Sequence, residues 1–311
     1  TMPWWDDIWL NEAFATWLAY ETVGRRDRAY GSELAFTDRR FDAMSADSLA
    51  AARRIRQPIE SNHDIRNAFD AITYSKGAAV LGMFERFIGR DAFRAGLSRY
   101  LQRFRFGSAT SDDFLSALED PKQQGGKPLA PAFKTFLDQP GVPFFDVTPL
   151  CKEGGKEPAK LRVRQERYLP TGSPASKAGL WQVPFCVRYG VRGDAGTTRD
   201  RAQCTLVTKA EEEVVLLGSA GCPAWVHPNG GGDGYYRFAL ASAGYEGLRA
   251  VASTLSAPER IAVADSLKAG FDAGRLDTKD VVHAASWLAA SPEGHVATHS
   301  MWIFELSLIH I

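Results

Sequence analysis

The sequence lacks any excess of charge, because its 37 lysines and arginines balance its 37 aspartates and glutamates. Without a field of one sign, the chain has no general means of gathering nucleic acid or of coating an anionic membrane. It also lacks an uninterrupted run of about 18 apolar residues, which a membrane-spanning helix needs. We therefore expect no nucleic-acid partner and no membrane span in these residues.

Cysteine is scarce, and the residues concerned are Cys151, Cys186, Cys204 and Cys222. They show neither CxxC spacing nor histidines at ligand distance, which argues against a thiolate metal site. If 183–207 form one hairpin centred near Ala195, Cys186 faces Cys204, and the even count suits two disulfides in an oxidising compartment. Four buried thiols in a reducing cytoplasm fit the pattern equally well. We favour export to the periplasm or the extracellular space.

Apolar residues, in contrast, are plentiful at 45% of 311 residues, which is enough for two or three compact units. Residues 1 to about 138 have mainly helical periodicity. An apolar stripe predicts a helix from Asn11 to Gly24, and a second runs from a possible cap at Asp70 to a stop at Gly89. Further helices are expected over 90–104, 110–119 and 130–138.

A domain boundary is predicted at Gln139-Pro-Gly-Val-Pro143, because proline cannot continue a helix. Short alternating runs follow, and they predict a small antiparallel β-sandwich over 145–241. Its expected strands lie at 161–165, 183–189, 204–207, 214–217 and 235–240. The glycine-rich stretch 229–234 precedes a strand rather than a helix, so it is interpreted as a turn and not as a phosphate loop.

Helices are expected again over 242–305. Ser256 has the form of a capping box, while Gly274 and Asp277 resemble the stop and the next start of paired helices. The last six residues, 306–311, match the translation of a transposon end used in preparing sequencing libraries. We interpret them as an artefact and expect the natural chain to continue past Glu305.

The most informative stretch is Trp4-Trp5-Asp-Asp-Ile-Trp-Leu-Asn-Glu12, in which a carboxylate near a helix start comes after dense aromatic sequence. Taken alone, Glu12 is explained by the preference of acidic side chains for the first turn of a helix. The stretch, however, resembles the segment after the HExxH helix in the aminopeptidase N family of zinc metallopeptidases, the gluzincins. In that family the glutamate of an Asn-Glu pair is the third zinc ligand.

A second stretch strengthens the resemblance. Tyr74-Ser-Lys76-Gly77 is similar to the family's Tyr-x-Lys-Gly segment, whereas an isolated tyrosine would more often be a partly buried aromatic with a locally satisfied hydroxyl. Phe136-Leu-Asp-Gln-Pro-Gly-Val-Pro143 resembles the end of the family's thermolysin-like domain. Gly234-Tyr-Tyr-Arg237 resembles the strand before its helical domain.

The resemblance implies a multidomain α+β fold: the helical carboxy-terminal half of a thermolysin-like catalytic domain over 1–144, the β-sandwich, then the start of a superhelical α-domain. It implies one Zn²⁺ in the complete enzyme, with Glu12 as a ligand and Tyr74 as the hydroxyl donor to the oxyanion. Both histidine ligands, the general base and the segment that binds the substrate's amino group would lie upstream of Thr1. The implied substrates are peptides with a free amino terminus, and the fragment alone is expected to be inactive.

Two alternatives share this fold. The first is a binding scaffold that has lost its metal ligands, although such a protein would need neither Glu12 nor Tyr74. The second is a related zinc hydrolase that opens an epoxide with the same zinc and tyrosine chemistry. Activity on aminoacyl anilides rather than lipid epoxides would separate the peptidase from the epoxide hydrolase.

Overall fold

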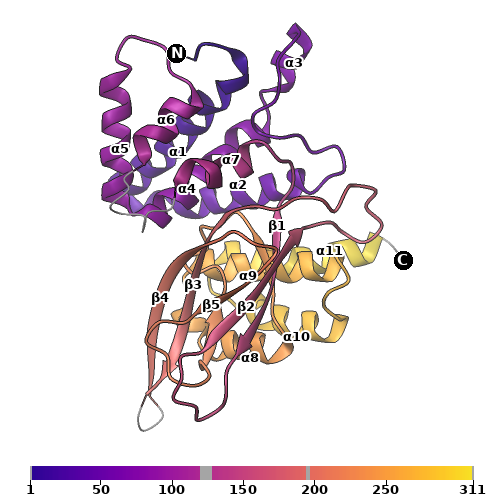
Figure 1. Ribbon diagram of the computed structural model, residues 1–311. Helices are drawn as coiled ribbons and strands as arrows, with labels where there is room; N and C mark the ends of the chain where they lie inside the picture. Colours follow the sequence, from indigo (N-terminus) through magenta and orange to yellow (C-terminus); the bar gives the residue numbers. More distant parts are fainter. Residues whose placement is uncertain (1, 120–127, 194–196, 310–311) are drawn as a thin grey trace. The chain divides into compact units, whose positions relative to one another are not determined.

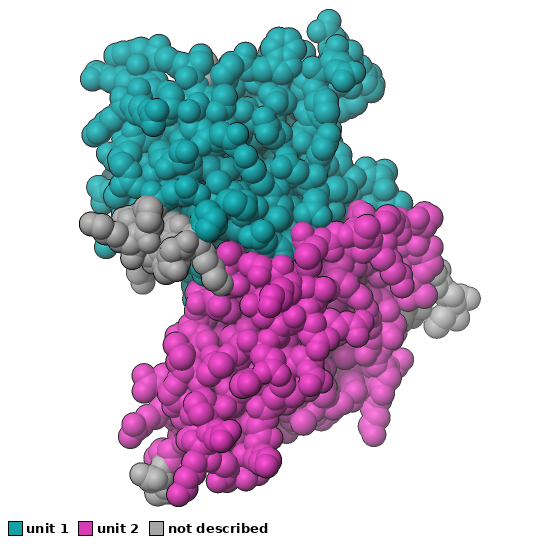
Figure 2. Space-filling view, in the orientation of Figure 1, with its two compact units in different colours: residues 1–141, 181–184 teal, residues 142–180, 185–311 magenta. Residues whose placement is uncertain are grey.

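The computed structural model describes residues 2–119, 128–193 and 197–309 as a mixture of helices and strands (Figure 1). The chain divides into two compact units, one of 1–141 with 181–184 and one of 142–180 with 185–311 (Figure 2). The division after residue 141 falls inside the segment that was predicted to end the helices. The strands and the helices after them group as one unit, and separate domains over 145–241 and 242–305 stay a prediction.

The first unit is helical. Its α-helices are α1 (Ile8–Arg26), α2 (Ser32–Asp47), α3 (Asn62–Asn67), α4 (Gly77–Ile88), α5 (Arg90–Arg103), α6 (Ser111–Leu118) and α7 (Leu129–Leu137). A π-helical segment, η3 (Ile72–Lys76), leads directly into α4. Gly89 ends α4 with a φ of 89°, as predicted from its lack of a side chain. The predicted helices are found within a few residues, whereas α2 was not predicted.

Aromatic side chains from α1, α4 and α7 form the core of this unit. Trp9 and Phe84 both pack on Phe133, and their ring centroids lie 6.0 and 4.5 Å, respectively, from that of Phe133. All three rings are fully buried. The indole nitrogen of Trp9 donates to the Ser111 hydroxyl at 3.0 Å, which satisfies its one polar atom. The core thereby fixes the start of α1, where Glu12 lies.

The second unit begins with two sheets. Its strands are β1 (Pro143–Leu150), β2 (Lys160–Arg167), β3 (Val183–Arg192), β4 (Thr198–Val207), β5 (Glu211–Val215), β6 (Trp225–His227) and β7 (Arg237–Ala239), although the first two residues of β3 group with the first unit. They are ordered β5-β2-β1-β7 and β4-β3-β6. The prediction of an antiparallel sandwich was wrong in one place, because β1 and β7 pair in parallel. Almost the whole sandwich separates these two strands in sequence, and a long connection permits parallel pairing.

Two disulfides join strands and loops of the second unit. Cys186 is bonded to Cys204, the pairing expected from a hairpin centred near Ala195, although 194–196 lie outside the described residues. Cys151 is bonded to Cys222, with the Cα atoms 5.1 Å apart. The structure therefore contains the two disulfides and not the four buried thiols of the alternative interpretation.

Four helices complete the described part of this unit: α8 (Ser242–Ala250), α9 (Ala257–Asp272), α10 (Thr278–Ala289) and α11 (Gly294–Ile309). The predicted capping box is present, since the Ser256 hydroxyl accepts from the Glu259 amide and the Glu259 carboxylate accepts from the Ser256 amide. Gly274 has a φ of 67°, and Asp277 caps α10, both as predicted.

The carboxyl end carries one prediction that the structure does not test. Residues 306–309 belong to α11, while 310 and 311 lie outside the described residues. The interpretation of 306–311 as an artefact stays a prediction. Within the described residues, no helix combines the length and the apolar character needed to cross a membrane.

Candidate functional site

The structure brings Glu12 and Tyr74 together in the first unit. Glu12 lies in the second turn of α1, and its side chain is half-buried, while Trp9 and Ala13 beside it face the core. Tyr74 is the central residue of the π-helical segment η3 and is half-buried too. The side chain and the charge of Glu12 both raise the pKa of the Tyr74 phenol, so the phenol and this carboxylate lie close together. The two residues singled out from separate motifs therefore share one site.

Close packing of two backbones makes this meeting possible. Gly77 directly succeeds η3, and a Cβ atom at this position would lie 2.6 Å from the Cβ of Ala13. Only glycine allows α1 and the start of α4 to approach so closely. Since Ala13 is the neighbour of Glu12 and Gly77 lies three residues after Tyr74, this contact sets the distance between the two site side chains.

The start of η3 is held by an ion pair. Asp70, predicted as a helix cap, accepts from the amides of Ile72 and Thr73 at 2.9 and 3.2 Å. The Arg53 guanidinium binds the same carboxylate at 3.0 Å through Nε and donates to the Thr73 hydroxyl at 2.7 Å. Because π-helical turns are rare and often occur at functional sites, a turn fixed in this way is a candidate for a functional role.

The surroundings keep Tyr74 protonated. Burial raises the pKa of the Tyr74 phenol above its ordinary value of 10.0, and the neighbouring side chain of Glu12 and its negative charge raise it further. The hydroxyl is thus a hydrogen-bond donor throughout the neutral pH range. A group with this property can stabilise an oxygen atom on which negative charge develops.

An exposed aromatic row adjoins Tyr74. The rings of Phe69 and Tyr74 lie 6.5 Å apart, and that of Trp5 lies 6.4 Å from Phe69. Trp5 is 39% and Phe69 43% exposed, so both present apolar surface to solvent beside the site.

The residues described do not form a metal site on their own. No group of three histidine, cysteine, aspartate or glutamate side chains converges within residues 2–119, 128–193 and 197–309. Glu12 has the carboxylate that a zinc ligand requires and is reachable from solvent, but it supplies one donor of the three that a catalytic zinc site uses. The ligand role of Glu12 and the donor role of Tyr74 stay predictions.

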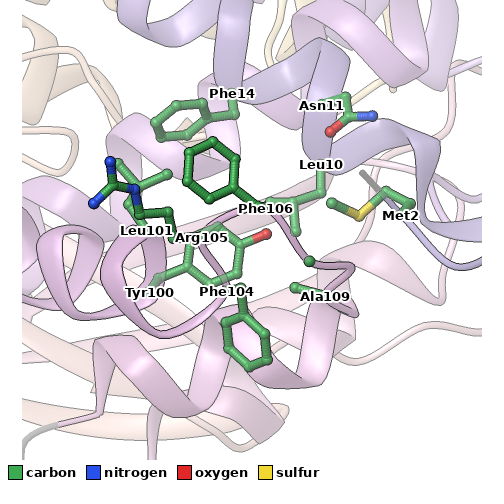
Figure 3. A pocket seen from close by; sticks show the side chains of 11 residues that line it. Met2, Leu10, Asn11, Phe14, Tyr100, Leu101, Phe104, Arg105, Phe106 and Ala109 are labelled. Atoms are coloured by element: carbon green, nitrogen blue, oxygen red, sulfur yellow. The ribbon is translucent and has the colours of Figure 1, made fainter.

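A pocket of the first unit lies away from Glu12 and Tyr74. It has a volume of about 450 Å³ and lies between α1 and the segment after α5, as Figure 3 shows. Leu10, Asn11 and Phe14 of α1 line it, together with Tyr100 and Phe106, whereas Glu12 and Tyr74 do not. The candidate site is therefore defined by the proximity of Glu12 and Tyr74 and not by this pocket.

The residues that support the site were not predicted from the sequence. Arg53 carried no local signal, because its partner lies in another segment. Asp47 and Lys76 form a buried ion pair beneath η3. Lys76 was noted only as part of the Tyr-x-Lys-Gly resemblance, and Asp47 lies at the end of the unpredicted helix α2.

Comparisons with known proteins agree with the motifs. A family model described as the peptidase family M1 domain matches residues 1–136, which include Glu12 and Tyr74. The tricorn protease-interacting factor F2 of Thermoplasma acidophilum is 30% identical over 282 residues, covering 90% of this chain and 32% of its own length. Aminopeptidase M1-A of Oryza sativa subsp. japonica is 29% identical, covering 91% of this chain and 31% of its own.

A third relative, the mitochondrial aminopeptidase 2 of Saccharomyces cerevisiae, is 27% identical over 92% of this chain and 28% of its own length. The chain thus spans about a third of the length of these relatives. The similarity extends beyond the matched domain into the strands and helices of the second unit. Through residues 1–136 and these relatives, the chain belongs to the M1 family of metallopeptidases, the aminopeptidase N family that its motifs resemble.

Proposed function

We propose that these residues form part of a zinc-dependent aminopeptidase, which removes amino-terminal residues from peptides. Glu12 would be one zinc ligand, and two histidines from an HExxH segment outside the 311 residues would be the others. The observation that supports the proposal most is the proximity of the Tyr74 phenol to the Glu12 carboxylate, within the residues matched by the M1 domain. Two relatives carry the word aminopeptidase in their names.

The metal would supply the chemistry that these residues lack. Zinc, when bound, would polarise the scissile carbonyl and acidify a water molecule. The general base would come from the HExxH segment as well. The 311 residues alone would therefore be inactive.

Tyr74 would donate its hydrogen bond to the carbonyl oxygen of the scissile peptide bond as negative charge develops there. A phenol is protonated at neutral pH, and the packing of Gly77 on Ala13 fixes the position of the segment that carries Tyr74 beforehand. Turning the O–H from Glu12 to the substrate oxygen needs rotation about the phenol C–O bond only, since the ring itself is held in place. The exposed rings of Trp5 and Phe69 would offer apolar contacts to a side chain of the bound peptide.

Replacing Tyr74 by phenylalanine in the zinc-loaded peptidase tests this role. We expect kcat for an aminoacyl anilide to fall by roughly 10² to 10³, with zinc content unchanged, because one oxyanion donor is lost. Tyr20→Phe is the matched control, since Tyr20 lies on α1 and packs on Phe36 with ring centroids 5.0 Å apart. Unchanged turnover in Tyr74→Phe would remove Tyr74 from the mechanism.

Zinc content and turnover, measured with aminoacyl anilides and with lipid epoxides, separate the other candidate functions. A binding scaffold would have neither stoichiometric zinc nor turnover, even with the HExxH segment in place. An epoxide hydrolase would turn over lipid epoxides faster than aminoacyl anilides. Either result would contradict the proposed peptidase.

A further inference from the structure

Lys76 and Asp47 form an ion pair that the proposed mechanism does not use. The Lys76 Nζ lies 2.8 Å from the Asp47 Oδ2, and neither side chain has any exposed surface. Lys76 also donates to the carbonyl of Gln139 at 3.2 Å, and the Asp47 Oδ1 accepts from the Gly141 amide at 2.8 Å. The pair therefore joins the end of α2, the π-helical segment and the chain after α7.

A pair of this kind is poorly explained as a source of stability. Removing two charges from water costs about as much as their attraction returns, so apolar residues of similar volume often serve as well. Such a pair can instead select one arrangement of the chain, because a partly satisfied buried network is strongly disfavoured.

The location of Lys76 identifies the arrangement that the pair selects. It is the last residue of η3 and lies two positions after Tyr74. A π-helical turn holds one residue more than an α-helical turn, which changes the direction of the side chains it carries. At its start η3 is fixed by Asp70 and Arg53, and at its end by Lys76 on Asp47. The phenol of Tyr74 projects from the middle of this doubly fixed turn.

We propose that Asp47 and Lys76 are positioning residues for Tyr74: they hold η3 in its π-helical form, so that the phenol hydroxyl meets Glu12. This inference rests on the proposed function of Tyr74. Without the pair, the segment is free to relax toward the commoner α-helical geometry, and the phenol moves away from its working position. A misplacement of about 1 Å can reduce a rate by roughly 10².

The test removes both charges together, so that no unpaired charge is left buried. In Asp47→Asn/Lys76→Met, asparagine keeps an acceptor for the Gly141 amide and methionine keeps the apolar stem. The matched control is Arg237→Met/Asp265→Asn in the second unit, where Arg237 and Asp265 lie 2.7 Å apart with side chains 5% and 9% exposed. It removes a comparable buried pair that has no connection with η3.

Hydrogen exchange on the 311-residue chain gives a reading that needs no metal. We expect the amides of 72–77 to exchange roughly tenfold faster in the Asp47/Lys76 variant, while those of α1 and α7 change little. The Arg237/Asp265 control should leave 72–77 unaffected. Unchanged exchange across 72–77 in the Asp47/Lys76 variant would overturn the proposal.

Kinetics of the zinc-loaded peptidase supply the second reading. We expect kcat to fall by roughly 10² with little change in KM, and we expect this loss to disappear when Tyr74 is already phenylalanine. A loss of equal size in the Tyr74→Phe background would overturn the positioning role, since the pair would then act independently of the phenol. Failure of the proposed function is distinguishable, because Tyr74→Phe alone would then leave turnover unchanged.

Discussion

The absence of a Cβ atom at Gly77 allows Glu12 and Tyr74 to lie close together. A methyl group at position 77 would overlap the Cβ of Ala13, which is attached directly to the α1 backbone and cannot rotate away. We expect Gly77→Ala to destabilise the first unit by about 1 to 3 kcal/mol, because the two helices must separate. Thermal unfolding measures this loss.

Gly82→Ala in the same helix is the control. The nearest atoms to its added Cβ would lie at 3.7 Å, an ordinary contact, and the better helix propensity of alanine should make it neutral or stabilising by up to about 1 kcal/mol. Adding Ala13→Gly to Gly77→Ala should restore part of the stability by making room. If Gly77→Ala proves as harmless as Gly82→Ala, the close contact does not set the position of η3.

Glu12 leads to a prediction about metal content. Since a lone carboxylate cannot replace a set of three ligands, the 311-residue chain should bind zinc far more weakly than the peptidase with its HExxH segment. Metal analysis after dialysis against zinc measures this. Stoichiometric zinc on the chain alone would show that the ligands lie within it and would contradict the proposed ligand set.

At the scale of secondary-structure elements, a buried histidine, His227, links strand β6 to helix α9. His227 is fully buried, its Nδ1 accepts from the Asn229 amide and its Nε2 donates to the carbonyl of Glu259 in α9. Burial lowers the pKa of His227 below 6.5, and the positive charge of Arg188 acts in the same direction, against the charge of Glu259. The neutral imidazole thus fastens a strand to a helix within the second unit.

The lowered pKa of His227 fixes the sign of its pH dependence. In the unfolded chain the imidazole takes up a proton near pH 6.5, whereas in the folded chain it does so only at lower pH. The contribution of neutral His227 to the free energy of unfolding is therefore complete above about pH 6.5 and is lost as the pH falls. We expect His227→Gln to be less stable at neutral pH but to lose less on acidification from about pH 7 to about pH 5. Urea unfolding across this range measures it, with the exposed His63→Gln as control. An unaltered slope in His227→Gln would contradict the assignment.

Elements with strong local signals could be predicted from the sequence. The caps at Ser256 and Asp277 are instances, because a capping side chain and its amide lie within one turn. Helix α2 was missed because its buried positions include Thr37, Arg40 and Asp47, which interrupt the apolar stripe that marks an amphipathic helix.

The candidate site was predictable only in part. Resemblance to a family pointed to Glu12 and Tyr74, but nothing in their spacing says that the two side chains meet. The π-helical form of η3 depends on Arg53 and Asp47, which are distant in sequence, so no local pattern could have predicted it. Supporting contacts of this kind become visible only in the folded chain.

At the scale of the whole molecule, both disulfides lie in the second unit. We propose that the protein acquires them in an oxidising compartment, in keeping with the export that the cysteines favour. Alkylation of thiols during lysis of the source cells tests this, because the proposal expects none of the four cysteines to react. Four alkylated cysteines would contradict it.

Reduction should act on one unit only. We expect the unfolding transition of the second unit to move to lower temperature, with a loss of about 2 to 5 kcal/mol per disulfide, while that of the first unit stays in place. Cys151 and Cys222 are 71 residues apart and Cys186 and Cys204 are 18 apart. Serine replacement of the longer-range pair should therefore cost roughly 1 kcal/mol more, which calorimetry of the two double variants measures. Equal losses would contradict the loop-entropy argument.

The path of the chain between the units limits how the protein can be truncated. Residues 181–184 belong to the first unit, although the segments on both sides belong to the second. There the ring of Trp181 is fully buried, and the Gln182 amide donates to the Thr135 hydroxyl at 3.1 Å. A truncated protein that ends at residue 141 would lack residues 181–184 and their packing beside α7. A minimal version of the first unit would therefore need these four residues joined to it through a short linker.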